Sequence, residues 1–263
     1  MLLADALGTE RLELYTGYHK PVEPDERDRF RDLVKRRARR EPVAYLLGEK
    51  GFYSLSFEVT AAVLIPRPET EHVAETALGI LEACATAPAN VLDLGTGSGN
   101  LAVTIAVHAS EALVDAVDNS NDALVVARQN ARRHSVDSRV RFFHGDLFEP
   151  VRNPPKRYSV IVSNPPYVRS DEIESLTPDV RLHEPVSALL DSKSPGGDGL
   201  GFYRAIANEA GQFLLPGGSV IVEVGERQAQ AVAEIFIGRG LSHVETVKDY
   251  RQTERVVVAR NSE

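Results

Sequence analysis

The 263-residue sequence has a single cysteine, no tryptophan and no low-complexity segment. One cysteine, Cys84, excludes an intrachain disulfide and any cysteine-based zinc site, and we predict no metal. Asp5 interrupts the N-terminal residues too early for the apolar stretch of a signal peptide. No run approaches the ~20 apolar residues that span a bilayer. These absences predict a cytoplasmic protein that binds no membrane.

Positive charge is also scarce, with 30 Lys and Arg against 38 Asp and Glu and a formal net charge of −8. This balance argues against broad attraction to nucleic-acid phosphates, and we expect no stable nucleic-acid binding. The basic run over 31–40 is interpreted as a solvated helix face. Hydrophobic residues make up 43% and charged residues 26%, as is typical of a folded globular protein.

Three units are predicted along the chain. Residues 1–48 form a helical domain, because leucines recur at helical spacing on both sides of a proline break. Residues 49–68 form a connector with a strand or hairpin over 52–59, where apolar residues alternate. Residues 69–263 form the main domain.

Helices and strands alternate through the main domain, which indicates an α/β fold with a doubly wound, mostly parallel sheet of seven strands. The last two strands are joined by a short polar turn, so they pair antiparallel. We predict helices over 69–84, 100–108, 121–134, 200–214 and 226–237, and strands over 91–94, 112–117, 139–144, 158–162, 219–224, 242–247 and 255–259.

A glycine-rich turn, Gly95-Thr96-Gly97-Ser98-Gly99, follows the first of these strands, where doubly wound sheets bind ligands. Its glycines allow close approach of a bulky cofactor. A dinucleotide loop would need glycine at position 100, which is Asn100, and a nucleophile elbow around Ser98 fails because Thr96 and Asn100 replace its glycines. Asp93, just before the turn, suits the cationic amino group of a methionine moiety better than a pyrophosphate.

Two more acids end the next two strands. Asp118 lies where a carboxylate accepts hydrogen bonds from ribose hydroxyls. Asp146 could accept from an adenine amino group while Leu147 packs on the ring. Strand-end aspartates also cap helices, but three of them beside one glycine loop are hard to attribute to capping alone.

The sharpest signal is Asn164-Pro165-Pro166-Tyr167, directly after the strand over 158–162. An amide or exocyclic amino nitrogen is a poor nucleophile, because its lone pair is delocalised, and it has to be aimed at the methyl donor. The Asn164 side-chain oxygen and the Pro165 carbonyl can each accept one N–H of such a group, and Tyr167 can pack on its plane. The prolines make these acceptors rigid. The alternative of an ordinary Asn-Pro-Pro turn is weakened by the preceding glycine-loop strand.

With these residues in hand, the sequence resembles the release-factor glutamine N5-methyltransferase family, which methylates the glutamine of the Gly-Gly-Gln loop in peptide chain release factors. The resemblance covers nearly the whole chain. It rests on the glycine loop, the tetrapeptide, Arg40-Glu41-Pro42-Val43-Ala44-Tyr45-Leu46-Leu47-Gly48, Leu64-Ile65-Pro66-Arg67-Pro68-Glu69-Thr70-Glu71, Gly145-Asp146-Leu147-Phe148, Asp198-Gly199-Leu200 and Phe202-Tyr203-Arg204.

The resemblance implies a protein-glutamine methyltransferase that uses S-adenosyl-L-methionine as cofactor and release factors as partners. It implies cofactor binding by Asp93, Gly95, Thr96, Gly97, Ser98, Gly99, Asp118, Asp146, Leu147 and Asn164, and substrate binding by Asn164, Pro165, Pro166 and Tyr167, of which Asn164, Pro165 and Tyr167 are catalytic. Arg67 and Glu69 are expected to close over the cleft. The chain departs from the family in a helical domain that is short at its N-terminus. It also departs at Asn119, whose polar side chain stands at a usually aliphatic position against the adenine.

Two other functions compete with this interpretation. N6-adenine methylation of DNA or RNA uses the same tetrapeptide, but it calls for a basic groove and a target-recognition region, and the sequence has no large insertion to hold one. A non-catalytic binding module would keep the fold without turnover. The intact glycine loop and tetrapeptide argue against it, and the segment over 64–71 favours the protein-glutamine branch.

Overall fold

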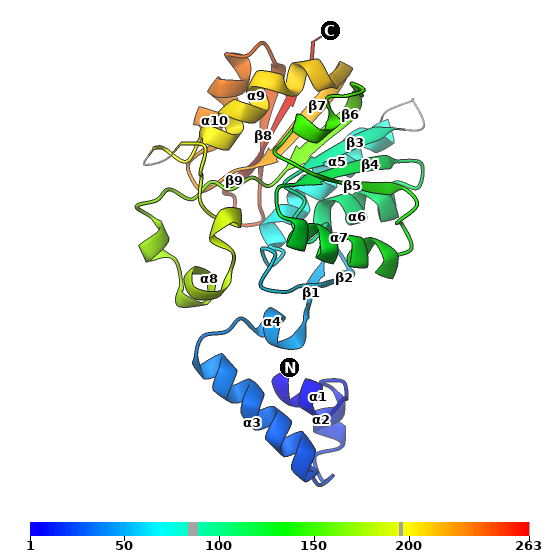
Figure 1. The fold of residues 1–263 in the computed structure, drawn as a ribbon, viewed down its shortest axis with the longest axis vertical. Coiled ribbons are helices and arrows are strands. Elements are labelled where there is room, and N and C mark those ends of the chain that lie inside the picture. Colours follow the sequence, from blue (N-terminus) through cyan, green and yellow to red (C-terminus); the bar gives the residue numbers. More distant parts are fainter. Residues whose placement is uncertain (84–88, 195–196, 263) are drawn as a thin grey trace.

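In the computed structural model, which describes residues 1–83, 89–194 and 197–262, a small helical unit projects from one end of a larger α/β body (Figure 1). Cys84 and the last residue of the helix expected over 69–84 lie outside the described residues. Within the described ranges, the helices are too short or too polar to cross a membrane.

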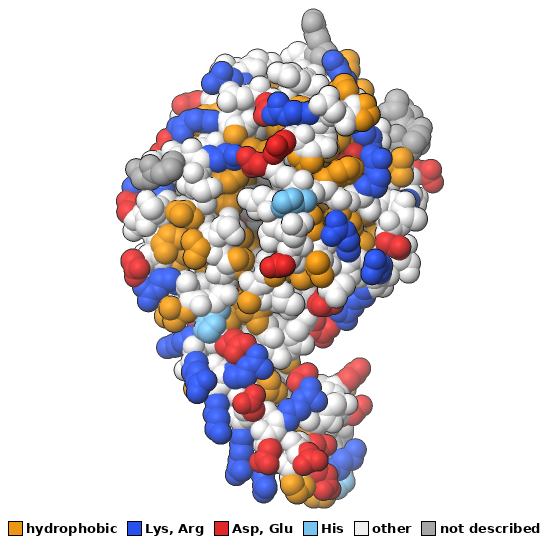
Figure 2. All heavy atoms as spheres, in the orientation of Figure 1, with side chains coloured by type: hydrophobic (Ala, Val, Ile, Leu, Met, Phe, Trp, Pro, Cys, Tyr) orange, Lys and Arg blue, Asp and Glu red, His pale blue; other side chains and the backbone are white. Residues whose placement is uncertain are grey.

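The helical unit contains α1 (Leu2–Ala6), α2 (Glu13–Thr16), α3 (Pro24–Ala38) and α4 (Val43–Leu47). Helix α3 begins with a capping box between Glu23 and Glu26, which satisfies backbone N–H groups that have no partner within the helix. Ala6, Leu33 and Leu46 form its small core. Figure 2 shows the Lys and Arg side chains of α3 on the surface, interspersed with acids, as predicted for a solvated helix face.

The connector is a two-stranded antiparallel hairpin of β1 (Glu49–Phe52) and β2 (Leu55–Glu58). Its turn residues, Tyr53 and Ser54, have φ of 47° and 62°. The segment over 52–59, for which the sequence predicts a strand or hairpin, therefore contains the turn and the second strand of the hairpin. The sequence hides this turn because neither position carries the Gly or Asn that usually adopts such angles. At the end of the predicted connector, Pro68 opens the 3-10 turn η1 (Pro68–Thr70), which leads directly into a helix.

The main sheet has seven strands in the order β5-β4-β3-β6-β7-β9-β8. Neighbours from β5 to β7 pair in parallel, and β9 runs antiparallel to both β7 and β8, which confirms the predicted fold. The strands are β3 (Asn90–Leu94), β4 (Leu113–Asp118), β5 (Val140–His144), β6 (Tyr158–Ser163), β7 (Leu214–Glu223), β8 (Ser242–Lys248) and β9 (Glu254–Arg260).

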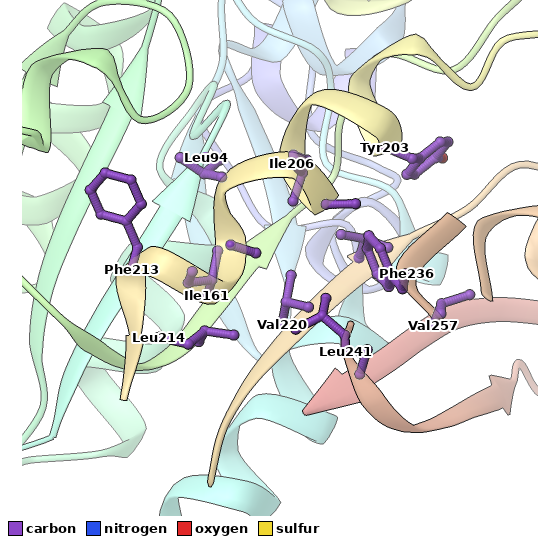
Figure 3. Close-up of a cluster of buried hydrophobic side chains, with 14 of the residues drawn as sticks. Leu94, Ile161, Tyr203, Ile206, Phe213, Leu214, Val220, Phe236, Leu241 and Val257 are labelled. Atoms are coloured by element: carbon purple, nitrogen blue, oxygen red, sulfur yellow. The ribbon is translucent and has the colours of Figure 1, made fainter. Parts of the chain in front are cut away.

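Helices cover both faces of the sheet, because successive strand residues point to opposite sides. Leu92 and Leu94 pack in the cluster that includes α9 (Gly201–Phe213) and α10 (Ala229–Ile237), drawn in Figure 3. Val91, the residue before Leu92, packs in the cluster on the other face, which includes α5 (Glu71–Ala83), α6 (Asn100–His108) and α7 (Asn121–Arg133). The main-domain helices thus lie near their predicted positions.

Two parts of the body differ from the sequence prediction. Strand β7 begins at Leu214, immediately after α9, whereas the prediction began at 219. The chain between β6 and α9 also forms short elements that carry no periodic pattern: η3 (Ile173–Ser175), α8 (Pro178–His183) and η4 (Val186–Ala188). A further 3-10 turn, η2 (Glu149–Val151), follows β5.

Asn130 on α7 connects the hairpin to the glycine loop. Its Oδ1 accepts from the Glu58 N–H at 2.7 Å, and its Nδ2 donates to the Glu58 and Ser98 carbonyls at 3.0 and 2.9 Å. The side chain is fully buried. One amide therefore satisfies three backbone groups from two segments that the sequence places far apart.

Replacement of Asn130 by alanine should leave those three buried groups without partners and lower the free energy of unfolding by about 3 kcal/mol. Chemical denaturation measures the loss. The control is Gln129→Ala, one position away on the exposed side of α7, which should change stability by less than about 0.5 kcal/mol. Equal effects of the two substitutions would contradict the role given to Asn130.

Candidate active site

The parallel pairing of β3 and β6 brings the two sequence motifs together. Leu94, the last residue of β3, lies opposite Ser163, the last residue of β6, and the Ser163 hydroxyl donates to the Leu94 carbonyl at 2.7 Å. The glycine loop begins at the next residue of one strand and the tetrapeptide at the next residue of the other. The carboxyl ends of these strands therefore form one site.

A cavity, here named the glycine-loop cavity, opens over the carboxyl ends of β3 and β4. Gly95 and Gly97, in its wall, have φ of 73° and 55°, where a side chain would be strained. Gly99 serves packing, since a Cβ there would lie 3.2 Å from the Ala127 Cβ on α7. Of the predicted cofactor residues, the wall contains Gly95, Thr96, Gly97, Ser98, Asp118, Asp146, Leu147 and Asn164.

Asp118 at the end of β4 is held in place by the glycine loop. Its Oδ2 accepts from the Gly97 N–H at 2.8 Å, and its Oδ1 accepts from the Ser120 N–H at 2.9 Å. Burial raises the pKa of Asp118, and the backbone donors oppose that rise. Each carboxylate oxygen keeps a further acceptor site, so Asp118 can bind two vicinal hydroxyls in the cavity.

Asp93 lies beneath the glycine loop and is not part of the cavity wall in the described structure. It is fully buried, and its Oδ2 accepts from the Thr96 hydroxyl at 2.6 Å and from the Ala102 N–H at 3.2 Å. Burial raises its pKa to about 7. These contacts join the loop to the start of α6, while Asp93 Oδ1 is buried without a hydrogen-bond partner in the described structure. Cofactor contact by Asp93 stays a prediction.

Asp146 and Leu147 follow β5 and line the same cavity. Asp146 is exposed and forms an ion pair with Lys193 at 2.6 Å, so one of its oxygens already has a partner. Leu147 has a φ of 48°, uncommon for a non-glycine residue. The backbone here turns sharply and places the leucine in the wall, where a flat ring could pack against it.

A second cavity, here named the tetrapeptide cavity, is lined by Asn164, Pro165 and Tyr167. Pro166 lines the glycine-loop cavity instead. Asn164 lines both cavities, as do Arg67, Leu64 and Ala188. The tetrapeptide thus lies between the glycine-loop cavity and the tetrapeptide cavity and contributes residues to the walls of both.

Arg67 and Glu69, the predicted cleft-closing pair, take different positions. Arg67 lines both cavities and donates to Glu184 Oε1 at 2.5 Å, while Glu184 Oε2 accepts from the Ile65 N–H at 3.1 Å. Glu184 is almost fully buried. Glu69 is absent from both walls as far as the chain is described. Closure over the cleft stays a prediction, and Glu184 is a partner that the sequence did not reveal.

Sequence reasoning also missed Thr70 and Glu223. Thr70 lines the glycine-loop cavity and Glu223 lines the tetrapeptide cavity. Glu223 is the last residue of β7, so the rule that selected Asp93, Asp118 and Asp146, an acid at a strand's carboxyl end, would have found it. In the described ranges, no cluster of three or more His, Cys, Asp or Glu side chains could hold a metal.

Comparison with known proteins agrees with this geometry. The model for the methyltransferase small domain matches residues 74–184, and the model for the PrmC N-terminal domain matches residues 1–48. A methyltransferase from Pyrococcus furiosus shares the fold, with a TM-score of 0.58 at 19% identity over 87% of this chain and 99% of its own.

Curated relatives match almost the whole chain. The release factor glutamine methyltransferase of Geobacter sulfurreducens is 44% identical over 261 residues, which are 98% of this chain and 87% of the relative. The enzymes of the same name from Cereibacter sphaeroides and Bacillus subtilis are 42% and 38% identical, each over 98% of this chain and over 88% and 89% of their own lengths. A two-cavity site on this fold, together with identity of this extent, shows that the chain belongs to the release factor glutamine methyltransferase family.

Proposed function

We propose that the protein transfers a methyl group from S-adenosylmethionine to the side-chain amide nitrogen, N5, of the glutamine in the Gly-Gly-Gln motif of peptide chain release factors. The observation that carries the proposal is Asn164, which lines both cavities. A donor in one cavity and an acceptor in the other would meet at this side chain.

The glycine-loop cavity fits the cofactor. The positive-φ glycines leave room for a bulky ligand, Asp118 has acceptor capacity for ribose hydroxyls, and Leu147 offers an apolar surface to a base. S-adenosylmethionine supplies a methyl group activated by the sulfonium charge. Asp146 would accept from the adenine amino group with the oxygen that Lys193 leaves free.

The tetrapeptide cavity fits the amide. Asn164 Oδ1 and the Pro165 carbonyl would each accept one N–H of the glutamine side chain, and Tyr167 would pack on its plane. The lone pair of the nitrogen then points along the line of transfer, and alignment of this kind supplies several kcal/mol of the barrier reduction. The two oxygens also stabilise the positive charge that develops on nitrogen.

The net charge of the protein and its sequence similarity both favour glutamine over adenine as the methyl acceptor. The net charge of −8 opposes a nucleic-acid backbone, and the chain is similar to protein-glutamine methyltransferases over nearly its whole length. A cytoplasmic location forms part of the proposal, because the proposed substrate is a translation factor. Division of the chain into a substrate-recognition unit over 1–48, a connector over 49–68 and a methyltransferase domain over 69–263 forms part of the proposal.

Substrate choice is tested by transfer of labelled methyl to three acceptors side by side. A release factor should be labelled, while the same factor with its loop glutamine replaced and duplex DNA should not. The acceptor amide is then the loop glutamine. Label in DNA or in the glutamine-less factor would overturn the proposed substrate.

The Asn164→Ala substitution should reduce methyl transfer to background, because the amide nitrogen loses one of its two aligning acceptors. Cofactor affinity, measured by calorimetry, should stay within about threefold of wild type, because the remaining wall of the glycine-loop cavity is intact. Asn208→Ala, an exposed asparagine on α9, is the matched control. A large loss of cofactor affinity in the Asn164 variant would show that its main role is in cofactor binding.

Asn119 lines the glycine-loop cavity beside Asp118 with an exposed polar side chain. Its replacement by isoleucine should tighten cofactor binding by about threefold or more, because apolar area would be buried against the adenine. Calorimetric titration of both proteins measures the change. Unaltered or weaker binding would show that the adenine does not rest on this residue.

A further inference from the structure

Two buried polar side chains from distant parts of the chain, Thr70 and Glu223, meet behind Asn164 of the tetrapeptide. The Asn164 Nδ2 group donates to Thr70 Oγ1 at 3.1 Å, and the Thr70 hydroxyl donates to Glu223 Oε2. Both Thr70 and Glu223 are 2% exposed. The Tyr167 hydroxyl is 3.4 Å from Glu223 Oε1 and donates to it. Glu223 therefore connects to both polar side chains of the tetrapeptide.

We propose that Thr70 and Glu223 are positioning residues that fix which end of the Asn164 amide faces the substrate. A hydroxyl has one hydrogen to donate, and the Glu223 carboxylate can only accept. Thr70 therefore gives its hydrogen to Glu223 and can offer Asn164 only lone pairs. Asn164 must turn its NH₂ group to Thr70, which leaves Oδ1 for the acceptor site.

This orientation matters because the two ends of an asparagine amide are nearly equal in size. With the amide turned around, Asn164 would present N–H groups to the N–H groups of the incoming glutamine, and both sides would be donors. The inference rests on the proposed function for its consequence in catalysis. The hydrogen-bond chain itself depends only on Thr70, Glu223 and Asn164.

The surroundings of Glu223 make the hydrogen-bond chain sensitive to protonation of its carboxylate. Burial raises the pKa of this carboxyl to about 7, and nearby Glu69 adds to the rise, while the Thr70 hydroxyl, Arg255 on β9 and Tyr167 oppose it. On α9, Tyr203 donates its hydroxyl to the Glu223 backbone carbonyl at 3.0 Å. At a pH above this pKa, the Glu223 carboxylate only accepts, so the hydrogen bonds from Asn164 to Thr70 and from Thr70 to Glu223 can run in one direction only. Below it, the added proton can be donated to Thr70, and the direction is no longer enforced.

The test compares four variants with wild type. Thr70→Val removes the hydroxyl at nearly equal volume, and Thr70→Ser keeps a hydroxyl at the same position. Glu223→Gln places an amide that can donate where the carboxylate only accepts, and Glu226→Gln is an exposed control nearby. In methyl transfer to a release factor, Thr70→Val and Glu223→Gln should lower kcat roughly 10- to 100-fold with little change in KM for the cofactor. Thr70→Ser should recover most of the lost kcat. Thermal unfolding verifies that each variant is folded.

The pH profile separates positioning from structural support. The wild-type rate should rise through pH 7 as Glu223 loses its proton, and Glu223→Gln should lack this rise because glutamine does not titrate. The Glu226→Gln control should keep it. A kcat of Thr70→Val within about threefold of wild type, or an unaltered acidic limb in Glu223→Gln, would overturn the inference.

A second measurement needs no substrate. The side-chain amide protons of Asn164, assigned by comparison with Asn164→Asp, should exchange slowly with solvent in wild type and Thr70→Ser and at least about tenfold faster in Thr70→Val. If wild-type protein labels no release factor, the proposed function is wrong, and proton exchange still decides whether Thr70 holds the amide. Equal exchange rates of the Asn164 amide protons in wild type and Thr70→Val would show that Thr70 does not hold this amide.

Discussion

The site depends on one pairing, that of β3 with β6 at the centre of the sheet. The two strands are parallel and in register to their last residues, Leu94 and Ser163, so both continue into loops on the same edge. One loop forms the floor of the glycine-loop cavity and the other begins with Asn164. A shift of this register by one residue would reverse the faces of β6 and move Asn164 away from the glycine loop.

Much of this could be predicted from the sequence, because the informative residues follow strands. Strand segments that end at glycine or acid located β3, β4 and β5, and the buried run before Ser163 and Asn164 located β6. Parallel pairing then required their carboxyl ends to meet. Asp118 and Asn164 were found in this way, and both lie in cavity walls. The roles of individual residues in binding and catalysis remain predictions.

Other features could not be predicted, for physical reasons. Whether Asp93 faces a cavity or the protein interior depends on the path of the glycine loop, which spacing alone does not give. The contact of Thr70 with Glu223 joins residues 153 positions apart in the chain. Helix α8 and its neighbouring turns have no apolar period, because they are short and lie at the surface. The hairpin turn at Tyr53 lacks the residues that mark such turns.

The segment that contains α8 gives the helical unit a fixed relation to the site. Asp179 on α8 pairs with Arg37 of α3 at 2.7 Å, and the His183 ring contacts the Arg39 carbonyl at 3.1 Å. The next residue, Glu184, holds Arg67 in the walls of both cavities. The first 48 residues are therefore not a freely exchangeable module. A chimaera that took them from a relative would need matching partners for Asp179 and His183, or it would alter the loop that carries Arg67.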